Sequence, residues 1–247
     1  MVQRVEGNSA IKMHSDLEVV LNDFMTTLEE VSVLLLAAEA CTEEEVKYAA
    51  YNKSALLLLS GKFENFIEVL AEQYLYIVNG LKLRSSLIPK AMRIHHTLSM
   101  LDEIMDFRNA GKYDEIIKRF PNLNSLWVAD VEFGDLRIEC KFNYGKHGES
   151  ELKQLFAPFG IDDIFSEVEV FIHDENASDG FSPKKIDFKG VFNSVMWMRN
   201  NILHQNASPS LTHRSIGEYK IVFESFSKTL IDSLDNKLNE LIKVAGK

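Results

Sequence analysis

Residues 15–40 read SDLEVVLNDFMTTLEEVSVLLLAAEA, and this stretch sets the expected fold. Its apolar residues recur at alternating spacings of four and three, the pattern of one buried face on an α-helix. Ser15 and Glu18 have the spacing of a capping box, so a helix is predicted to begin at Ser15 and to run to about Ala40. The expected buried face consists of Leu17, Leu21, Phe24, Leu28, Val31, Leu35 and Ala38.

A second, longer helix is expected directly afterwards, capped near Thr42 and ending at Asn79-Gly80. Gly61 lies inside it and indicates a kink or a close helix contact. Because the connection is short, the two helices are expected to be antiparallel neighbours in a bundle. A third helix is expected from Pro89 through Ile94, Leu98, Leu101 and Ile104-Met105. Later helices are expected over 113–120, from about Asp187 to His204, and from Thr212 or Ser215 through Leu241.

The segment before the penultimate helix changes its periodicity. Alternating apolar residues from Val131 to Phe142, interrupted by Gly134-Asp135, predict a small β-hairpin or, almost equally, a loop with apolar anchors. Short helices are expected at 149–156 and 162–171. The sequence therefore predicts one domain over 1–247, mainly all-α. It is a helical bundle of long antiparallel helices, with a small α/β-like insert at about 123–171 and a polar linker or mobile loop at about 173–185.

Composition bounds the class of protein. The chain has 247 residues, of which 46% are apolar and 26% charged, which suits one large core and excludes general disorder. The net charge of −10 argues against a surface that coats nucleic acid, although a local basic cleft is compatible with it. Cys41 and Cys140 are far apart, the N-terminus lacks the apolar core of a signal peptide, and no apolar run reaches membrane-spanning length. We therefore expect a cytoplasmic protein with no membrane partner.

The stretch 197–206, WMRNNILHQN, carries the candidate chemistry, because Arg199 is followed by Asn200 and, five residues on, by His204. Five residues turn a helix through roughly 500°, so Arg199 and His204 should point about 140° apart. His204 must then lie at or beyond the helix end, where the chain can turn it back. A second copy across a two-fold axis would bring two such pairs to one composite cleft.

These side chains suit phosphodiester cleavage. A histidine with a pKa near 6.5 moves protons at neutral pH, and an arginine holds a phosphate and stabilises added negative charge. Asn200 and Asn201 can orient the imidazole or donate to phosphate oxygens. The stretch offers no tight metal site, so the nucleophile must be internal, and the RNA 2′-OH supplies one. The expected activity is a metal-independent, cofactor-free RNA endonuclease that leaves a 2′,3′-cyclic phosphate and a 5′-hydroxyl and does not cut DNA.

The segment from Arg199 to His204 resembles the Arg-x4–6-His signature of HEPN ribonucleases, including the polar residue after the arginine. The position of the motif at the end of the penultimate long helix is also similar. Phe63-Glu64-Asn65-Phe66, the turn Leu87-Ile88-Pro89 and the final Leu-rich helix resemble the RiboL-PSP-type branch most, over Leu17 to Leu241.

The resemblance implies an RNA substrate, a homodimer through the motif helix, and a role as a toxin or anti-phage effector, often restrained by an antitoxin or regulatory partner. It assigns Arg199 and His204 as the catalytic pair and Asn200 as their polar companion. Gln205 stands where many members have glycine, which bears on the turn that aims His204. Some members are inactive, so a non-catalytic dimerisation module, or one that binds nucleotide or RNA, is the alternative function.

Several residues admit two interpretations. Arg199 and His204 also suit an ordinary helix C-terminus, and Glu64 is either a surface carboxylate or a buried group that orients Arg199. Lys184, Lys185, Lys189 and Arg214 either line an RNA path or are solvated surface cations.

Other residues have a favoured structural interpretation. His95-His96 are expected to be structural or surface histidines, and Trp197 and Met198 to be core residues, not base-stacking platforms. His173-Asp174 resembles the dyad of metal phosphohydrolases but has no second dyad at a suitable spacing. Arg108-Asn109 repeats the start of the motif without a downstream histidine.

Overall fold

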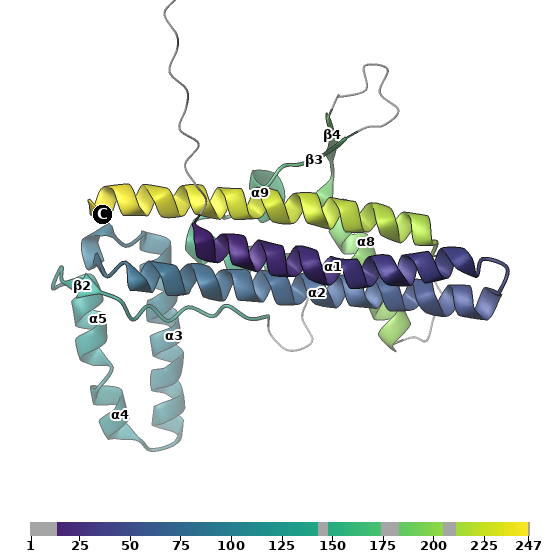
Figure 1. Ribbon diagram of the computed structural model, residues 1–247. Coiled ribbons are helices and arrows are strands. Elements are labelled where there is room, and N and C mark those ends of the chain that lie inside the picture. Colours follow the sequence, from purple (N-terminus) through teal and green to yellow (C-terminus); the bar gives the residue numbers. More distant parts are fainter. Residues whose placement is uncertain (1–13, 143–147, 174–182, 205–210, 247) are drawn as a thin grey trace, which may run out of the picture.

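The computed structural model describes residues 14–142, 148–173, 183–204 and 211–246. Three long helices lie side by side, with α1 antiparallel to α2 and α9, and α8 crosses them (Figure 1). These helices are α1 (Ser15–Ala40), α2 (Glu45–Gly80), α8 (Phe188–His204) and α9 (His213–Ala245). The predicted mainly all-α bundle is confirmed.

The ends of α1, α2 and α8 were predicted to within two residues, whereas α9 extends four residues beyond Leu241, to Ala245. Thr212 caps α9 as one of the two expected residues, because its Oγ1 accepts the Ser215 N–H at 3.1 Å. The cap of α1 is His14 and not Ser15, and the His14 N–H donates to Asp235 Oδ1 of α9 at 2.8 Å. The cap of α2 is likewise Glu44 and not Thr42.

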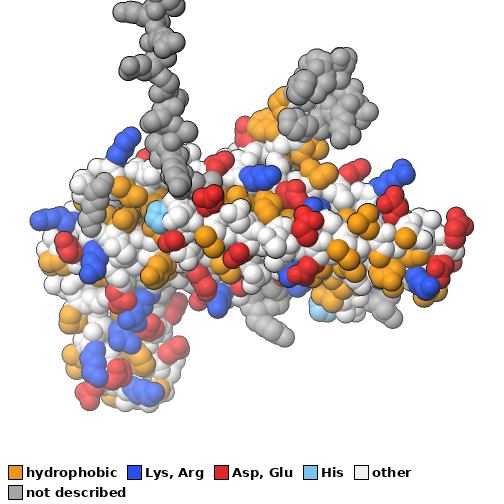
Figure 2. Space-filling model, in the orientation of Figure 1, with side chains coloured by type: hydrophobic (Ala, Val, Ile, Leu, Met, Phe, Trp, Pro, Cys, Tyr) orange, Lys and Arg blue, Asp and Glu red, His pale blue; other side chains and the backbone are white. Residues whose placement is uncertain are grey.

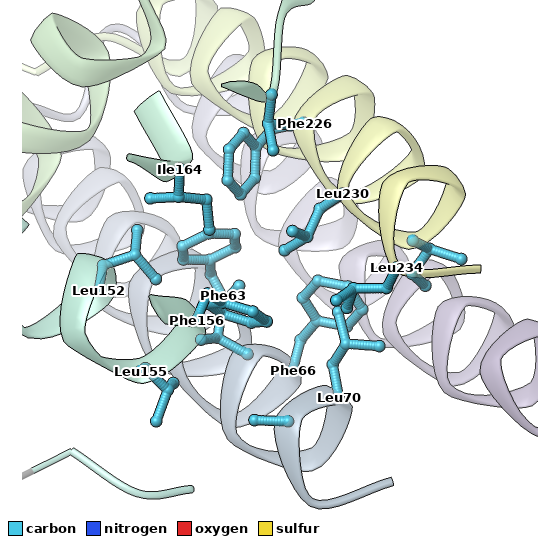
Figure 3. Packing of buried hydrophobic residues seen from close by; sticks show 14 of the residues in the cluster. Phe63, Phe66, Leu70, Leu152, Leu155, Phe156, Ile164, Phe226, Leu230 and Leu234 are labelled. Carbon is cyan, nitrogen blue, oxygen red and sulfur yellow. The ribbon is translucent and has the colours of Figure 1, made fainter. Parts of the chain in front are cut away.

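Aromatic side chains fill the junction of α2, α8 and α9. The Phe63 ring meets Phe223 edge-on, with 4.5 Å between centroids, and also contacts Phe192 and Phe188. Phe188 in turn stacks on Phe226 at 3.7 Å. Figure 3 shows α2 and α9 side chains packed with Leu152, Phe156 and Ile164, which come from α6 (Glu149–Phe156) and α7 (Ile164–Glu167). Part of the predicted insert therefore belongs to the bundle core.

A smaller lobe projects from one end of the bundle (Figure 1). It contains α3 (Lys90–Asn109), α4 (Tyr113–Ile117) and α5 (Phe120–Trp127). One helix over 113–120 was predicted, but the chain forms two. Pro121 lies in the first turn of α5, where its missing N–H leaves no helical hydrogen bond unmade. Two antiparallel strands, β1 (Leu83–Arg84) and β2 (Glu132–Phe133), close the base of the lobe. Between β1 and α3 the chain forms a 3-10 turn, η1 (Ser85–Leu87).

The β-hairpin predicted over 131–142 is wrong, and the alternative of a loop with apolar anchors is correct. Leu136, Ile138 and Cys140 are buried, as their alternation requires. The hydrogen bonds that a partner strand would supply come instead from side chains of α2 and α3. Asn79 holds both the N–H and the C=O of Leu136, at 2.8 and 3.1 Å, and His96 Nδ1 accepts the Arg137 N–H at 2.8 Å.

His96 is a buried structural histidine, as expected. Its Nδ1 accepts a hydrogen bond, so Nε2 carries the proton and donates to Asn122 Oδ1 at 2.7 Å. Burial lowers the pKa of this imidazole. The neutral ring thus joins α3 to α5 and to the segment after β2.

The two ends of the polar stretch predicted as a linker at 173–185 belong to strands that pair with each other. Strand β3 (Val170–His173) runs antiparallel to β4 (Pro183–Ile186), and Ser225 Oγ of α9 donates to the Phe171 C=O at 2.8 Å. The helix expected over 162–171 is therefore wrong in its second half. Residues 174–182, including Asp174, lie outside the described residues. The remaining 3-10 turn, η2 (Ala157–Phe159), follows α6.

Two glycines give a matched test of the backbone. Gly61 marks neither a kink nor a close contact, since α2 runs on through it and a Cβ there would meet no atom within 4 Å. Gly61→Ala should therefore raise the free energy of unfolding by about 0.5–1 kcal/mol, because alanine loses less backbone entropy. Gly134→Ala should lower it, since its Cβ would lie 2.9 Å from the Asn79 carbonyl oxygen. Urea denaturation measures both, and a destabilised Gly61→Ala would contradict this account.

Candidate active site

Arg199 is held on the inner side of α8. Asp187 Oδ1 accepts the Gly190 N–H at 3.1 Å at the start of this helix, and Phe188, Phe192 and Val195 form its buried side. At 100° per residue Arg199 lies within about 20° of Phe188 and Phe192 around the axis. Since Phe192 packs on Phe63, the next residue of α2, Glu64, comes within reach of Arg199.

Glu64 and Arg199 form an ion pair. Arg199 Nη2 donates to Glu64 Oε2 at 3.4 Å, and the two side chains are only 15% and 18% exposed. Arg199 Nη1 donates to Asn200 Oδ1 at 3.2 Å. Each terminal guanidinium nitrogen carries two hydrogens, so both can donate again to a phosphate oxygen. The structure thus brings together Glu64, Arg199 and Asn200.

His204 is the last described residue of α8 and is exposed. Around the axis it points about 140° from Arg199, toward the outer face of the helix. Residues 205–210, including Gln205, lie outside the described residues. The chain returns at Leu211, which is buried and accepts the Asn52 side-chain N–H at 3.3 Å.

The outer face of α8 differs from the prediction at Trp197. Met198 is buried as expected, but Trp197 is 64% exposed, so its assignment to the core is wrong. The reason is rotational, because Trp197 lies opposite Phe188 and Phe192 on the helix. Asn201 is buried and so does not share the surface of Asn200 and His204.

Sequence reasoning missed the surface that surrounds Trp197. Asn193, Trp197, Asn200 and His204 follow one another at spacings of four, three and four and are all exposed. Beside them is a shallow depression lined by Asn193, Ser194, Trp197, Met198 and Tyr219. The spacing itself was a signal that these residues share one face.

The suggested RNA-contacting cations do not gather at His204 within one protomer. Lys189 pairs with Glu149 at 2.8 Å in the first turn of α8, roughly 22 Å along the axis from His204. Lys185 pairs with Glu169, Lys184 is exposed on β4, and Arg214 is exposed at the start of α9. On the face in Figure 2, basic and acidic side chains alternate and form no continuous basic track.

Of the dyad His173-Asp174, only His173 lies in the described ranges 14–142, 148–173, 183–204 and 211–246. No group of three or more His, Cys, Asp and Glu side chains is arranged to hold a metal ion there, and His173 lies in β3. None of the helices in those ranges has the length and apolar character needed to cross a bilayer.

A helical bundle whose penultimate helix ends in Arg-x4-His has the arrangement of a HEPN domain. The model of the RiboL-PSP-HEPN family matches residues 22–240, so the chain belongs to this family. No curated protein and no solved structure matches it.

The ion pair should be measurable as a coupling. In a double-mutant cycle of Glu64→Gln and Arg199→Gln, we expect a coupling free energy of about 1–2 kcal/mol. This exceeds the roughly 0.2–1 kcal/mol of surface ion pairs, because the pair is more buried. Urea denaturation at one fixed protein concentration provides the four free energies. The control is Glu44–Lys47, a pair of highly exposed side chains that should couple less. Additive effects of the two substitutions would contradict the contact.

Proposed function

We propose that this protein is a metal-independent RNA endonuclease whose catalytic groups are Arg199 and His204, with Asn200 as companion. The observation that supports it best is the Glu64–Arg199 pair. It fixes a half-buried guanidinium near the end of the helix that presents an exposed imidazole. An ordinary surface arginine at a helix C-terminus would not need a carboxylate from a second helix.

The proposed step is a transesterification. The 2′-OH transfers its proton to a neutral His204 imidazole, and its oxygen forms a bond to phosphorus. The bond from phosphorus to the 5′-oxygen breaks, and that oxygen takes a proton from the protonated His204 of the second copy. Arg199, oriented by Glu64, binds the phosphate and stabilises its added negative charge. The products are a 2′,3′-cyclic phosphate and a 5′-hydroxyl.

The active form is proposed to be a homodimer through α8. Arg199 faces inward and His204 outward on one helix, so a single copy does not present both to one phosphate along the helix face. The outward face also carries the exposed Trp197 and its depression, which suit burial against a second copy. The Arg199 guanidinium contacts Asn200 at the edge of that face, so a two-fold axis there would bring the Asn200 and His204 of the second copy toward it.

Substitution of the pair tests the reaction. Arg199→Ala and His204→Ala should each lower the cleavage rate at least about a hundredfold, since each removes a proton-transferring or charge-stabilising group. The assay follows a labelled RNA in EDTA and maps its termini, and induction in cells should arrest growth only with the wild type. Arg108→Ala is the matched control, because Arg108-Asn109 repeats the motif's start on α3 and is exposed.

The outcomes separate three functions. Cleavage retained in both variants would contradict the proposed catalytic pair. Cleavage that requires Mg²⁺ would indicate a metal-dependent hydrolase. Intact RNA with the wild type and normal growth would favour a HEPN module that only dimerises or binds RNA or nucleotide.

Trp197→Glu should convert the dimer to a monomer and abolish cleavage, because it places a charge in the proposed interface. Light scattering coupled to gel filtration gives the mass of each variant. Leu36→Glu on α1 is the control, since Leu36 is equally exposed but does not line the depression beside Trp197. A Trp197→Glu protein of unchanged dimeric mass would exclude this interface.

A further inference from the structure

Helix α3 has a second apolar face that the fold leaves uncovered. Its inner face, with Met92, His96 and Met100, is buried against the rest of the lobe. The opposite side carries an apolar seam, which we define as Ile94, Leu98, Leu101 and Met105, each between 38% and 51% exposed. The seam lies about 170° from the inner face, so the packing of α3 within the described part of the chain does not account for it.

The spacing of the seam indicates what kind of element it contacts. Steps of four, three and four place these residues on the a and d positions of a heptad, which is the pattern for packing against another α-helix. The seam spans less than two heptads, about 16 Å, whereas stable self-paired coiled coils extend over at least about three. A symmetric pair of α3 helices alone is therefore too short, and the occupant must contact more than the seam.

A groove continues the surface from Leu98. It lies between α3, the segment after Ile138 and the α6–η2 turn, and Leu155 and Pro158 form part of its apolar lining. Among the described residues, three carboxylates line it, those of Asp102, Glu139 and Glu151, and one ammonium, that of Lys141.

The two basic side chains that line the groove in the described part of the chain add little positive charge to it. Lys141 is already paired with Glu72 at 3.4 Å. His95 also lines the groove, but burial lowers the pKa of its imidazole, so it is mostly neutral at pH 7. A second copy of this chain, with its net charge of −10, matches such a surface poorly.

We propose that the seam and the groove together form a docking site for an amphipathic helix of another protein, with apolar residues at heptad spacing flanked by Lys and Arg. The apolar seam supplies affinity, and the carboxylates of the groove select a basic helix. The seam lies on the lobe (Figure 1), the groove extends from it to α6 and η2, and the proposal does not depend on the proposed cleavage reaction.

The test uses a designed helical peptide of 21 residues with Leu at the a and d positions and Lys on the flanks, and the same peptide with Glu on the flanks. Fluorescence anisotropy with the full chain should show saturable binding of the Lys peptide only. Leu101→Glu and Glu139→Lys should each weaken binding about tenfold. Leu36→Glu, an exposed leucine on α1, is the control and should bind as the wild type does.

Hydrogen exchange locates the bound peptide, which should protect the α3 amides. Equal binding of both peptides, unchanged affinity of Leu101→Glu, or protection elsewhere would overturn the proposal. So would a fall in oligomeric mass caused by Leu101→Glu, because the seam would then bind a second copy of this chain.

Discussion

The structure depends on the aromatic contacts around Phe63. This ring on α2 meets Phe192 and Phe188 of α8 and Phe223 of α9, so one buried point fixes how three helices cross. Glu64 is the next residue along α2, and Arg199 lies two turns after Phe192 along α8. The ion pair between them is therefore a consequence of core packing. A cavity at Phe63 would displace the guanidinium as well as loosen the bundle.

The long helices could be predicted because their apolar residues repeat at helical spacing over many turns, as in α1 and α9. The motif residues Arg199, Asn200 and His204 could be found because their spacing is local. Helix α3 of the lobe was predicted in the same way, but the division of the next segment into α4 and α5 and the backbone partners of residues 131–142 were not. An alternating pattern shows which residues are buried but not what pairs with the backbone, and here the partners are the side chains of Asn79 and His96.

The sequence also could not predict which side of α8 is buried. Sequence shows that Trp197 belongs to an apolar run, but only the packing of α2 and α9 decides which side of the helix is covered. The same holds for α3, whose apolar residues form two opposite stripes. The exposed stripes on α8 and α3 are the surfaces on which the proposed interactions depend.

The pairing of β1 with β2 determines where the lobe can change in length. The chain leaves α2 and returns at neighbouring points, with Leu83 opposite Phe133, so everything between them forms a closed excursion. Its far end, at α4 and the turns beside it, can be lengthened or trimmed without moving the bundle, whereas α3 packs on η2. Change in this appendage can therefore alter what the protein recognises while the helix that bears Arg199 and His204 keeps its place.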